Sequence, residues 1–171
     1  HNIYHQAAIA NDFILDIDLI DRVEVIRGAS SSLYGTNAFL GIINVKTKSG
    51  EGIKGLELSG EGGRFSTYKG RLSYGNRFDN GLEVLLSGTR YGSDGNPTLF
   101  YKEFNAPATN FGIAKNADGE MYGSLFGRMA FQDFTLAASY NKRKKEIPTA
   151  AFETVFNDDD TQTTDARGFV E

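Results

Sequence analysis

The stretch Ile20 to Gly50, which reads IDRVEVIRGASSSLYGTNAFLGIINVKTKSG, contains two strand patterns separated by a glycine-punctuated turn. Arg22 to Arg27 alternates charged with β-branched residues, and this alternation predicts a short, half-buried strand. Gly28 ends the strand, because glycine adopts backbone angles that are closed to other residues. The first half of the stretch therefore predicts one strand and a sharp exit from it.

The second half predicts a turn of helix followed by another strand. Ser30 to Tyr34 is compatible with one helical turn that has a serine cap and stops at Gly35. Gly41 then opens a segment rich in β-branched residues that runs to Lys48 and predicts the second strand. The residues before this stretch predict irregular chain that leads into a short helical turn around Asp18 to Asp21.

This order closely resembles the end of the plug domain of TonB-dependent outer-membrane receptors, where the pattern IERIEV.RGP...LYG..A.GG.INI.TK precedes the first barrel strand. Here Gly28-Ala29 stands in place of the usual Gly-Pro, and Leu40-Gly41 in place of the usual Gly-Gly. Among the residues that match the pattern, the candidate site residues of the plug turn are Gly28, Tyr34, Gly35, Gly41 and Asn44. The resemblance implies that residues 1–50 form the C-terminal part of a plug and residues 51–171 the first strands of a barrel. Because complete receptors are several times longer, it also implies an internal piece of one.

From Lys54 onward a period of two is sustained through five segments, with a possible sixth from Asp165 to Glu171. Apolar residues share one parity, on which only Lys54, Arg90 and Lys142 are charged, each near a strand end. Leu85 is an apolar exception on the polar parity. The expected lipid-facing residues are Leu58, Leu72, Leu86, Leu125 and Leu136, and the expected lumen-facing residues are Glu57, Arg71, Glu83, Arg128 and Ser139.

Connection lengths give a second indication of a barrel. Residues 78–81 and 132–133 form tight turns, whereas residues 93–120 and 145–164 form long connections that are rare in compact soluble domains. The short connection at 63–66 is an exception. The predicted fold is mainly β: the end of a mixed α/β plug, then the first five or six antiparallel strands of a large transmembrane β-barrel. Alternation by itself fits a soluble β-sandwich equally well.

The composition excludes several classes of function. A net charge of −4, from 18 basic and 22 acidic residues, offers no basic excess for nucleic acid. No cysteine is present, and no apolar run approaches the roughly eighteen residues of a membrane-spanning helix. No signal peptide and no TonB-box segment are visible. His1 and His5 are the only histidines, and the glycines lack nucleotide-binding spacing, so no active site and no cofactor are expected.

Three charged residues near the turn are candidates for contact between plug and barrel: Arg22, Glu24 and Arg27. In the family, plug arginines meet glutamates of the inner barrel wall, and Arg27 is the best match. The alternative is a solvated strand end or a local pair between Arg22 and Glu24, which contributes little when it is exposed.

Three further segments carry candidate binding residues. Aromatic residues and a lysine in the first long connection are candidates for ligand contact, although a cluster that packs the loop on itself is the alternative. These residues are Phe100, Tyr101, Lys102, Phe104 and Phe111. The acidic segment 157–165 suggests calcium, but it fails the EF-hand pattern and is better interpreted as a solvated loop, so no metal site is predicted. The basic run 142–145 suits lipopolysaccharide phosphates or a charged sheet edge.

The resemblance implies part of a receptor in the bacterial outer membrane, for active uptake of a scarce nutrient such as a ferric siderophore or cobalamin. The implied partners are the nutrient, outer-membrane lipid and lipopolysaccharide, and the TonB complex through a segment upstream of residue 1. Two alternatives remain open at this point. One is a passive outer-membrane porin or adhesin, and the other is a soluble β-rich binding module.

Overall fold

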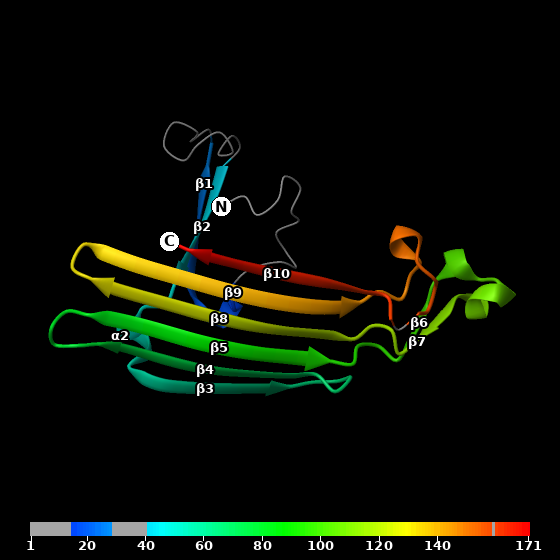
Figure 1. Cartoon of the computed structure of the whole chain (residues 1–171), viewed down its shortest axis with the longest axis horizontal. Coiled ribbons are helices and arrows are strands. Elements are labelled where there is room, and N and C mark those ends of the chain that lie inside the picture. The colour runs from blue at the N-terminus through cyan, green and yellow to red at the C-terminus, as the bar shows by residue number, and fades with distance from the viewer. Residues whose placement is uncertain (1–14, 29–40, 159) are drawn as a thin grey trace.

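The main body of the protein is one long, twisted antiparallel sheet (Figure 1). The structure is a computed structural model that describes residues 15–28, 41–158 and 160–171. The six strands lie in the order β10-β9-β8-β5-β4-β3. Strands of this sheet that follow one another along the chain are therefore hydrogen-bonded neighbours. They are β3 (Gly55–Gly62), β4 (Tyr68–Arg77), β5 (Glu83–Ser93), β8 (Glu120–Phe131), β9 (Phe134–Glu146) and β10 (Gln162–Val170).

This meander confirms the antiparallel strands predicted from the period of two. The sixth strand begins at Gln162 and not at Asp165, because its backbone already pairs with Glu146 at that position. Tight turns join the strands at one end of the sheet, where Phe78 N–H donates to the Leu82 carbonyl (2.8 Å). At the other end lie the long connections, as Figure 1 shows.

The long connections, for which the sequence predicted no regular elements, contain short strands and turns. The first contains a small hairpin of β6 (Thr98–Phe100) and β7 (Ile113–Lys115), with the 3₁₀ turns η2 (Lys102–Phe104) and η3 (Pro107–Gly112) between its strands. The second contains η4 (Ala151–Glu153). Hairpin pairing satisfies backbone groups that a bare loop would leave to water. In the described residues, no helix is both long and apolar enough to cross a membrane.

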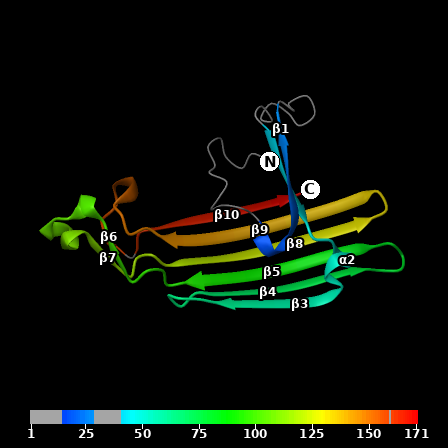
Figure 2. The ribbon, with the colours of Figure 1, turned by 180° about the vertical axis from the view of Figure 1, so that it is seen from behind.

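A second, separate hairpin precedes the large sheet. Strands β1 (Ile20–Arg27) and β2 (Gly41–Thr47) pair antiparallel, which confirms both strands predicted around the turn. The turn of helix expected over Ser30 to Tyr34 lies outside the described residues. Figures 1 and 2 show the hairpin rising away from the sheet, with its base against one sheet face.

The helical turn expected around Asp18 to Asp21 lies slightly earlier, as the 3₁₀ turn η1 (Ile17–Leu19). The reason is a cap: the Asp16 carboxylate accepts the Asp18 N–H at 3.0 Å, and Ile20 is already extended. Figure 2, which views the structure from behind, shows η1 in front of the middle of the large sheet.

A short helix, α2 (Gly50–Ile53), connects β2 to β3 and lies on β4 and β5. Ser49 caps it by accepting the Gly52 N–H at 3.0 Å, and Lys54 ends it in the left-handed conformation with φ 52°. The helix approaches the sheet closely. A Cβ atom on Gly75 would stand 2.7 Å from both the Gly50 carbonyl oxygen and the Ile53 Cβ.

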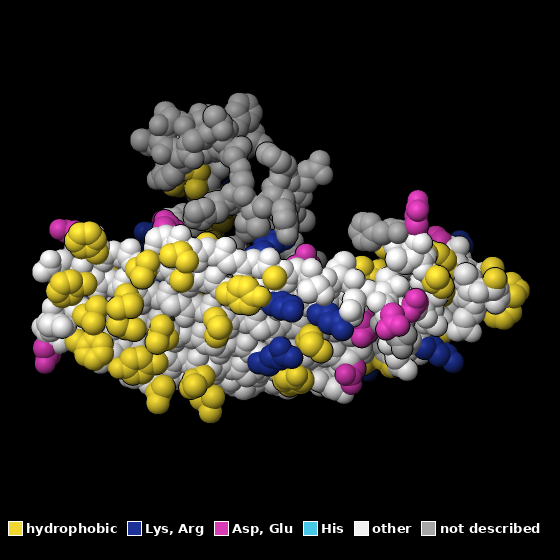
Figure 3. All heavy atoms as spheres, viewed as in Figure 1, with side chains coloured by type: hydrophobic (Ala, Val, Ile, Leu, Met, Phe, Trp, Pro, Cys, Tyr) yellow, Lys and Arg dark blue, Asp and Glu magenta, His cyan; other side chains and the backbone are white. Residues whose placement is uncertain are grey.

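The two faces of the large sheet differ in polarity and exposure, in the opposite sense to a water-soluble sheet. The apolar face is exposed, with Leu58 82% and Leu125 62% accessible, and Figure 3 shows its apolar side chains spread over the strands. The covered face is the polar one. Its buried polar side chains are Arg71, Ser73, Ser87, Thr89, Ser124 and Ser139. A water-soluble sheet would bury the apolar face instead.

The small core lies on the polar face, beneath η1. Leu19, Leu85 and Phe126 are buried together, and Leu15 and Ile53 pack against them. Leu85 was the apolar exception in the sequence pattern, and Phe126 shares its parity. Strand alternation turns both side chains inward, and the segment before β1 and the helix α2 bury them.

We expect Gly75→Ala to destabilise the docking of α2 by about 1–3 kcal/mol, since the added methyl group meets backbone that cannot move independently of the sheet. Urea unfolding of the refolded chain in neutral detergent measures the change. Gly70→Ala on the same strand is the matched control, because its Cβ would meet nothing within 4 Å. Equal stability of the two variants would contradict the close packing of α2.

Candidate functional site

The candidate site is the polar contact between η1 and the covered face of the sheet. At its centre is Asp16, whose side chain is 0% exposed. Its carboxylate accepts the Thr89 hydroxyl at 2.6 Å and the Lys69 ammonium at 3.0 Å, in addition to the Asp18 N–H. The residue that caps η1 is thus also bound to strands β4 and β5.

Lys69 extends this contact to a second aspartate. Its Nζ lies 2.6 Å from Asp18 Oδ2 and 3.6 Å from Glu61 Oε1 on β3. The lysine side chain is only 11% exposed. One largely buried cation therefore joins two carboxylates, those of Asp16 and Asp18, to the large sheet.

Arg71 continues the network along the covered face. It donates to Glu57 Oε1 at 2.5 Å and to Ser73 Oγ at 2.7 Å, and Ser73 Oγ shares a hydrogen bond with Ser87 Oγ at 2.8 Å. Its Nε lies 3.8 Å from Asp18 Oδ2. The network thus connects η1 with β3, β4 and β5 in a region where a single unpaired charge would be costly.

The electrostatics favour the ionised form of Asp16. Burial raises the pKa of its carboxyl, but the hydrogen bonds from Thr89, the Asp18 N–H and Lys69, with the positive charge of Lys69, outweigh burial and hold the pKa below 3.8. A lowered pKa means that this contact stabilises the folded protein at neutral pH and weakens when Asp16 is protonated.

The charges predicted to join plug and barrel lie elsewhere. Arg22 pairs with Glu24 and with Asp21, both at 2.9 Å, and Glu24 also accepts from Asn44 at 3.0 Å across the small hairpin. Arg22 lowers the pKa of Glu24 to about 2, with help from Lys46 and Asn44. In this structure these residues form the local pair that was the alternative interpretation. Arg27, further along β1, is exposed. Their role between plug and barrel stays a prediction.

Of the predicted turn residues, three are described. Gly28 has φ 109°, which only glycine adopts without strain. Gly41 lies opposite Arg27, and a Cβ there would stand 2.7 Å from the Ile26 carbonyl oxygen, so a side chain would obstruct the pairing of the strands. Asn44 faces Glu24, as given above. Tyr34 and Gly35 lie outside the described residues.

The candidate ligand residues divide into two groups. Phe104 stacks on the buried Phe156 of the second long loop at 4.5 Å, and Tyr101 meets the same ring edge-on at 6.0 Å. Burial and the charge of Asp118 raise the pKa of Tyr101. These side chains pack the loops on one another. Phe100 and Phe111 are exposed, as is Lys102, and the role of the whole set in ligand contact stays a prediction.

Asp118 fixes the base of the same loops. It pairs with Lys145 at 2.5 Å and accepts the Asn96 N–H at 2.9 Å. Burial raises the pKa of its carboxyl, but these contacts outweigh burial and lower the pKa overall. Asp158 of the acidic segment accepts the Asp160 N–H at 3.0 Å as a local turn. Among the residues that the structure describes, no three His, Cys, Asp or Glu side chains gather as a metal site would require.

Sequence reasoning missed the central residues Asp16, Asp18, Lys69 and Thr89. Their signal was present in part, because Asp16 and Asp18 belong to an acidic alternation and Lys69 lies on the polar parity of its strand. Nothing in the sequence indicated which of many such charges meet. The charges are also distributed the opposite way from the expected pairing of plug arginines with barrel glutamates. Here the acidic residues lie before β1 and the basic residues lie on the large sheet.

Comparison with known proteins matches part of the chain to one family. The model of the TonB-dependent receptor plug domain matches residues 3–42. The chain is 36% identical over 74 residues to the vitamin B12 transporter BtuB of Vibrio vulnificus, an alignment that covers 43% of this chain and 12% of that protein. It is 33% identical over 66 residues to the ferric-pyoverdine receptor PbuA of a Pseudomonas species, covering 39% of this chain and 8% of that protein. The matched part is thus a small fraction of either relative. One name denotes a transporter and the other a receptor, and neither denotes an enzyme.

We expect Asp16→Asn to loosen the contact between η1 and the sheet by about 2–3 kcal/mol, because it removes the charge that compensates Lys69 in a buried place while Asp18 retains part of the pairing. Amide hydrogen exchange of residues 15–19 in the detergent-solubilised chain measures this opening. Asp21→Asn, which alters an exposed pair, serves as the control and should leave the exchange unchanged.

Exchange measured against pH gives an independent check on the same residue. The folded pKa of Asp16 is lowered, so its contribution is complete above the ordinary value of 3.8 and is lost as the pH falls through the lowered folded value. Protection in the wild-type chain should therefore decrease below pH 4, and Asp16→Asn should flatten this part of the profile. An unchanged profile in the variant would show that Asp16 does not control the contact.

Proposed function

Because this chain belongs to the TonB-dependent receptors, we propose that it forms the junction between the plug and the barrel of an outer-membrane receptor. Residues 1–50 are assigned to the plug and residues 51–171 to the first barrel strands. Helix α2 (Gly50–Ile53) straddles this boundary and rests on β4 and β5, as a connector between two domains would. A barrel of this class has about 22 strands around a plugged lumen, so the six strands here are a sector of its wall.

The observation that carries the proposal is the reversal of the two sheet faces. Leucines are exposed on one face, while Arg71, Ser73 and Thr89 are buried on the other beneath the chain that precedes β1. A bilayer favours this arrangement, since lipid accepts the apolar face and the lumen accepts the polar one. In the described part of the chain no second sheet covers the leucines, as a soluble module would require.

The membrane orientation follows from the connections. Outer-membrane barrels have short periplasmic turns and long extracellular loops. The turn at residues 78–81 and the turn after Phe131 are then periplasmic, and β6, β7 and η4 lie outside the cell. Lipid and lipopolysaccharide are the partners of the apolar face. A passive porin or adhesin would have no need of a plug, and the match to residues 3–42 argues against it.

The nutrient is proposed to be scarce and small, such as a ferric siderophore or cobalamin. Support comes from the names of the two relatives, one a vitamin B12 transporter and the other a ferric-pyoverdine receptor. The exposed Phe100, Phe111 and Lys102 in the extracellular loops are the proposed contacts on this chain.

The contact of Asp16 and Asp18 with Lys69 and Arg71 is proposed to hold the plug in its resting place. Energy delivered by the TonB complex to a segment upstream of residue 1 would act against it. A set of hydrogen-bonded ion pairs suits this purpose, because its strength depends on geometry and falls steeply once the charges are drawn apart and hydrated.

We expect uptake of the nutrient by the complete receptor to require a working TonB system. Cells that make the receptor with TonB should accumulate labelled cobalamin or ferric siderophore, and cells without TonB should show only the background of cells that lack the receptor. The control is a passive nutrient that enters through porins at the same rate in both strains. Uptake at an unchanged rate without TonB would refute the transport proposal.

The membrane assignment predicts a division by parity along the strands. Spin labels on single cysteines at Leu58, Leu72 and Leu125 of the receptor should be relaxed by lipid-soluble oxygen, because a one-residue register shift would bring charges into hydrocarbon. Labels at Glu57, Arg71 and Arg128 should not be relaxed by oxygen. If both sets respond alike, the strands do not face lipid on one side only, and the soluble β-rich module takes the place of the barrel.

A further inference from the structure

The apolar face carries a small cluster of basic side chains that the proposed transport function does not use. They are Arg90 on β5 and Lys142 and Lys144 on β9, all on the parity of the exposed leucines. Figure 3 shows basic side chains gathered on this face between the apolar region and the end with the long loops. The sequence pattern had placed Arg90 and Lys142 on the apolar parity, and the structure adds Lys144 because β9 continues to Glu146.

The strand parity divides that run into two pairs with different surroundings. Arg143 and Lys145 point to the covered face, where Arg143 pairs with Glu120 at 2.6 Å and Lys145 with Asp118 at 2.5 Å. Lys142 and Lys144 point to the apolar face with Arg90. Among the described residues, no carboxylate oxygen lies within ion-pair distance (4.0 Å) of these three cations. No carboxylate of the described chain therefore compensates these outward cations.

The backbone between the cations leaves room for that partner. Gly123 on β8 pairs with Arg90 on one side and with Lys142 on the other, so a residue without a side chain separates two basic ones. A guanidinium nitrogen of Arg90 lies 3.7 Å from the place where a Gly123 Cβ would stand. The three cations, with Met121, Gln162 and Thr164, line a hollow of about 370 Å³.

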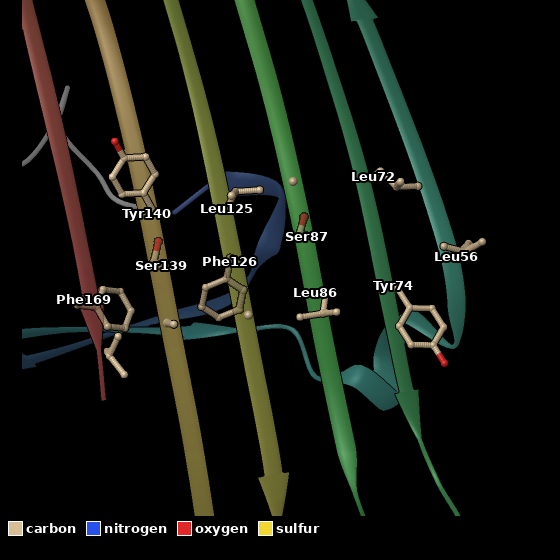
Figure 4. A pocket seen from close by; sticks show the side chains of 14 residues that line it. Leu56, Leu72, Tyr74, Leu86, Ser87, Leu125, Phe126, Ser139, Tyr140 and Phe169 are labelled. Carbon is tan, nitrogen blue, oxygen red and sulfur yellow. The ribbon is translucent and has the colours of Figure 1, made fainter.

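An apolar groove continues from this hollow along the same strands. Its volume is about 670 Å³, and Leu72, Leu86, Leu125 and Tyr140 lie along it, as Figure 4 shows. Gly88 and Gly127 form part of its floor. Gly88 precedes Arg90 by one outward position on β5, and Tyr140 precedes Lys142 by one outward position on β9. Cations and groove therefore form one continuous surface.

We propose that this surface binds a phosphorylated acyl lipid of the outer leaflet, with its phosphate at Arg90, Lys142 and Lys144 and an acyl chain in the groove. The proposal rests on the proposed function, because the loop end must face outward. Arginine and lysine both bind phosphate, and the arginine fork does so with two parallel hydrogen bonds. Charge complementarity selects the phosphate, and the apolar groove selects a lipid over a free anion. A second copy of this chain laid on the same surface would bring like charges together.

The test uses the full chain in neutral detergent, with apparent Kd values from native mass spectrometry. The probe is diphosphorylated lipid A, compared with the same lipid after removal of both phosphates and with inorganic phosphate as competitor. We expect the dephosphorylated lipid to bind at least tenfold more weakly, and inorganic phosphate at the same concentration not to displace the lipid. Replacing Arg90, Lys142 and Lys144 together by Gln should weaken binding on the order of a hundredfold at low salt, and less at high salt.

Two further variants exclude simpler explanations. Replacing Lys54, Arg77 and Lys115 by Gln removes the same net charge from exposed positions elsewhere and should leave lipid binding unchanged. Gly123→Val keeps every charge but fills the gap between Arg90 and Lys142, and it should weaken binding while the strand signal in circular dichroism is retained.

Equal binding by the wild type and the Arg90, Lys142 and Lys144 variant would overturn the proposal, and so would an equal loss in the charge-matched control. Displacement of the lipid by inorganic phosphate at the same concentration would identify a free-anion site and overturn the lipid assignment. Uptake that does not need TonB would instead refute the transport function. The two failures are therefore distinguishable.

Discussion

The alternation of side chains through six paired strands is the constraint on which the rest of the structure depends. Because neighbouring residues of a strand point to opposite faces, the backbone pairing decides at once which residues face outward. Leu72 cannot be exposed unless Arg71 and Ser73 lie on the other face. A sheet that exposes leucine on this scale requires an apolar solvent outside and a polar filling inside. In the proposed receptor, the same constraint sets both the contact with the membrane and the need for a plug.

The segment that covers the polar face of the sheet is positioned by specific charged contacts. Lys69 and Arg71 on the covered face meet Asp16 and Asp18, and the small core of Leu19, Leu85 and Phe126 lies close by in the same contact. Removing ions from water is costly, so such pairs contribute less to net stability than their short distances suggest. In the proposed receptor, a misplaced plug would leave those ions buried without partners, and this penalty would fix its position.

The outer face uses charge differently. Arg143 and Lys145 are compensated by carboxylates on the covered side, whereas Lys142 and Lys144, one residue away in each case, are directed outward beside Arg90. Alternation thus divides the basic run 142–145 into two residues that form ion pairs on the covered face and two residues that point outward. The compensated basic residues also hold the long loops in place. Lys145 pairs with Asp118 at the base of these loops, and within the loops Phe156 packs against Phe104.

The sequence by itself determined the strands, the face to which each residue belongs and the resemblance to a plug, because these depend on local patterns with a period of two and on glycine positions such as Gly28 and Gly41. It predicted where the chain turns, although boundaries differ. The turn expected around Asp18 to Asp21 spans Ile17–Leu19, because the Asp16 side chain caps it one residue earlier. Only the tertiary structure decided which charges meet. Asp16 and Lys69 are 53 residues apart, and no local pattern connects them. Their contact exists because α2 returns the chain onto β4 and β5 and brings η1 over the covered face, where burial leaves each ion dependent on its partner.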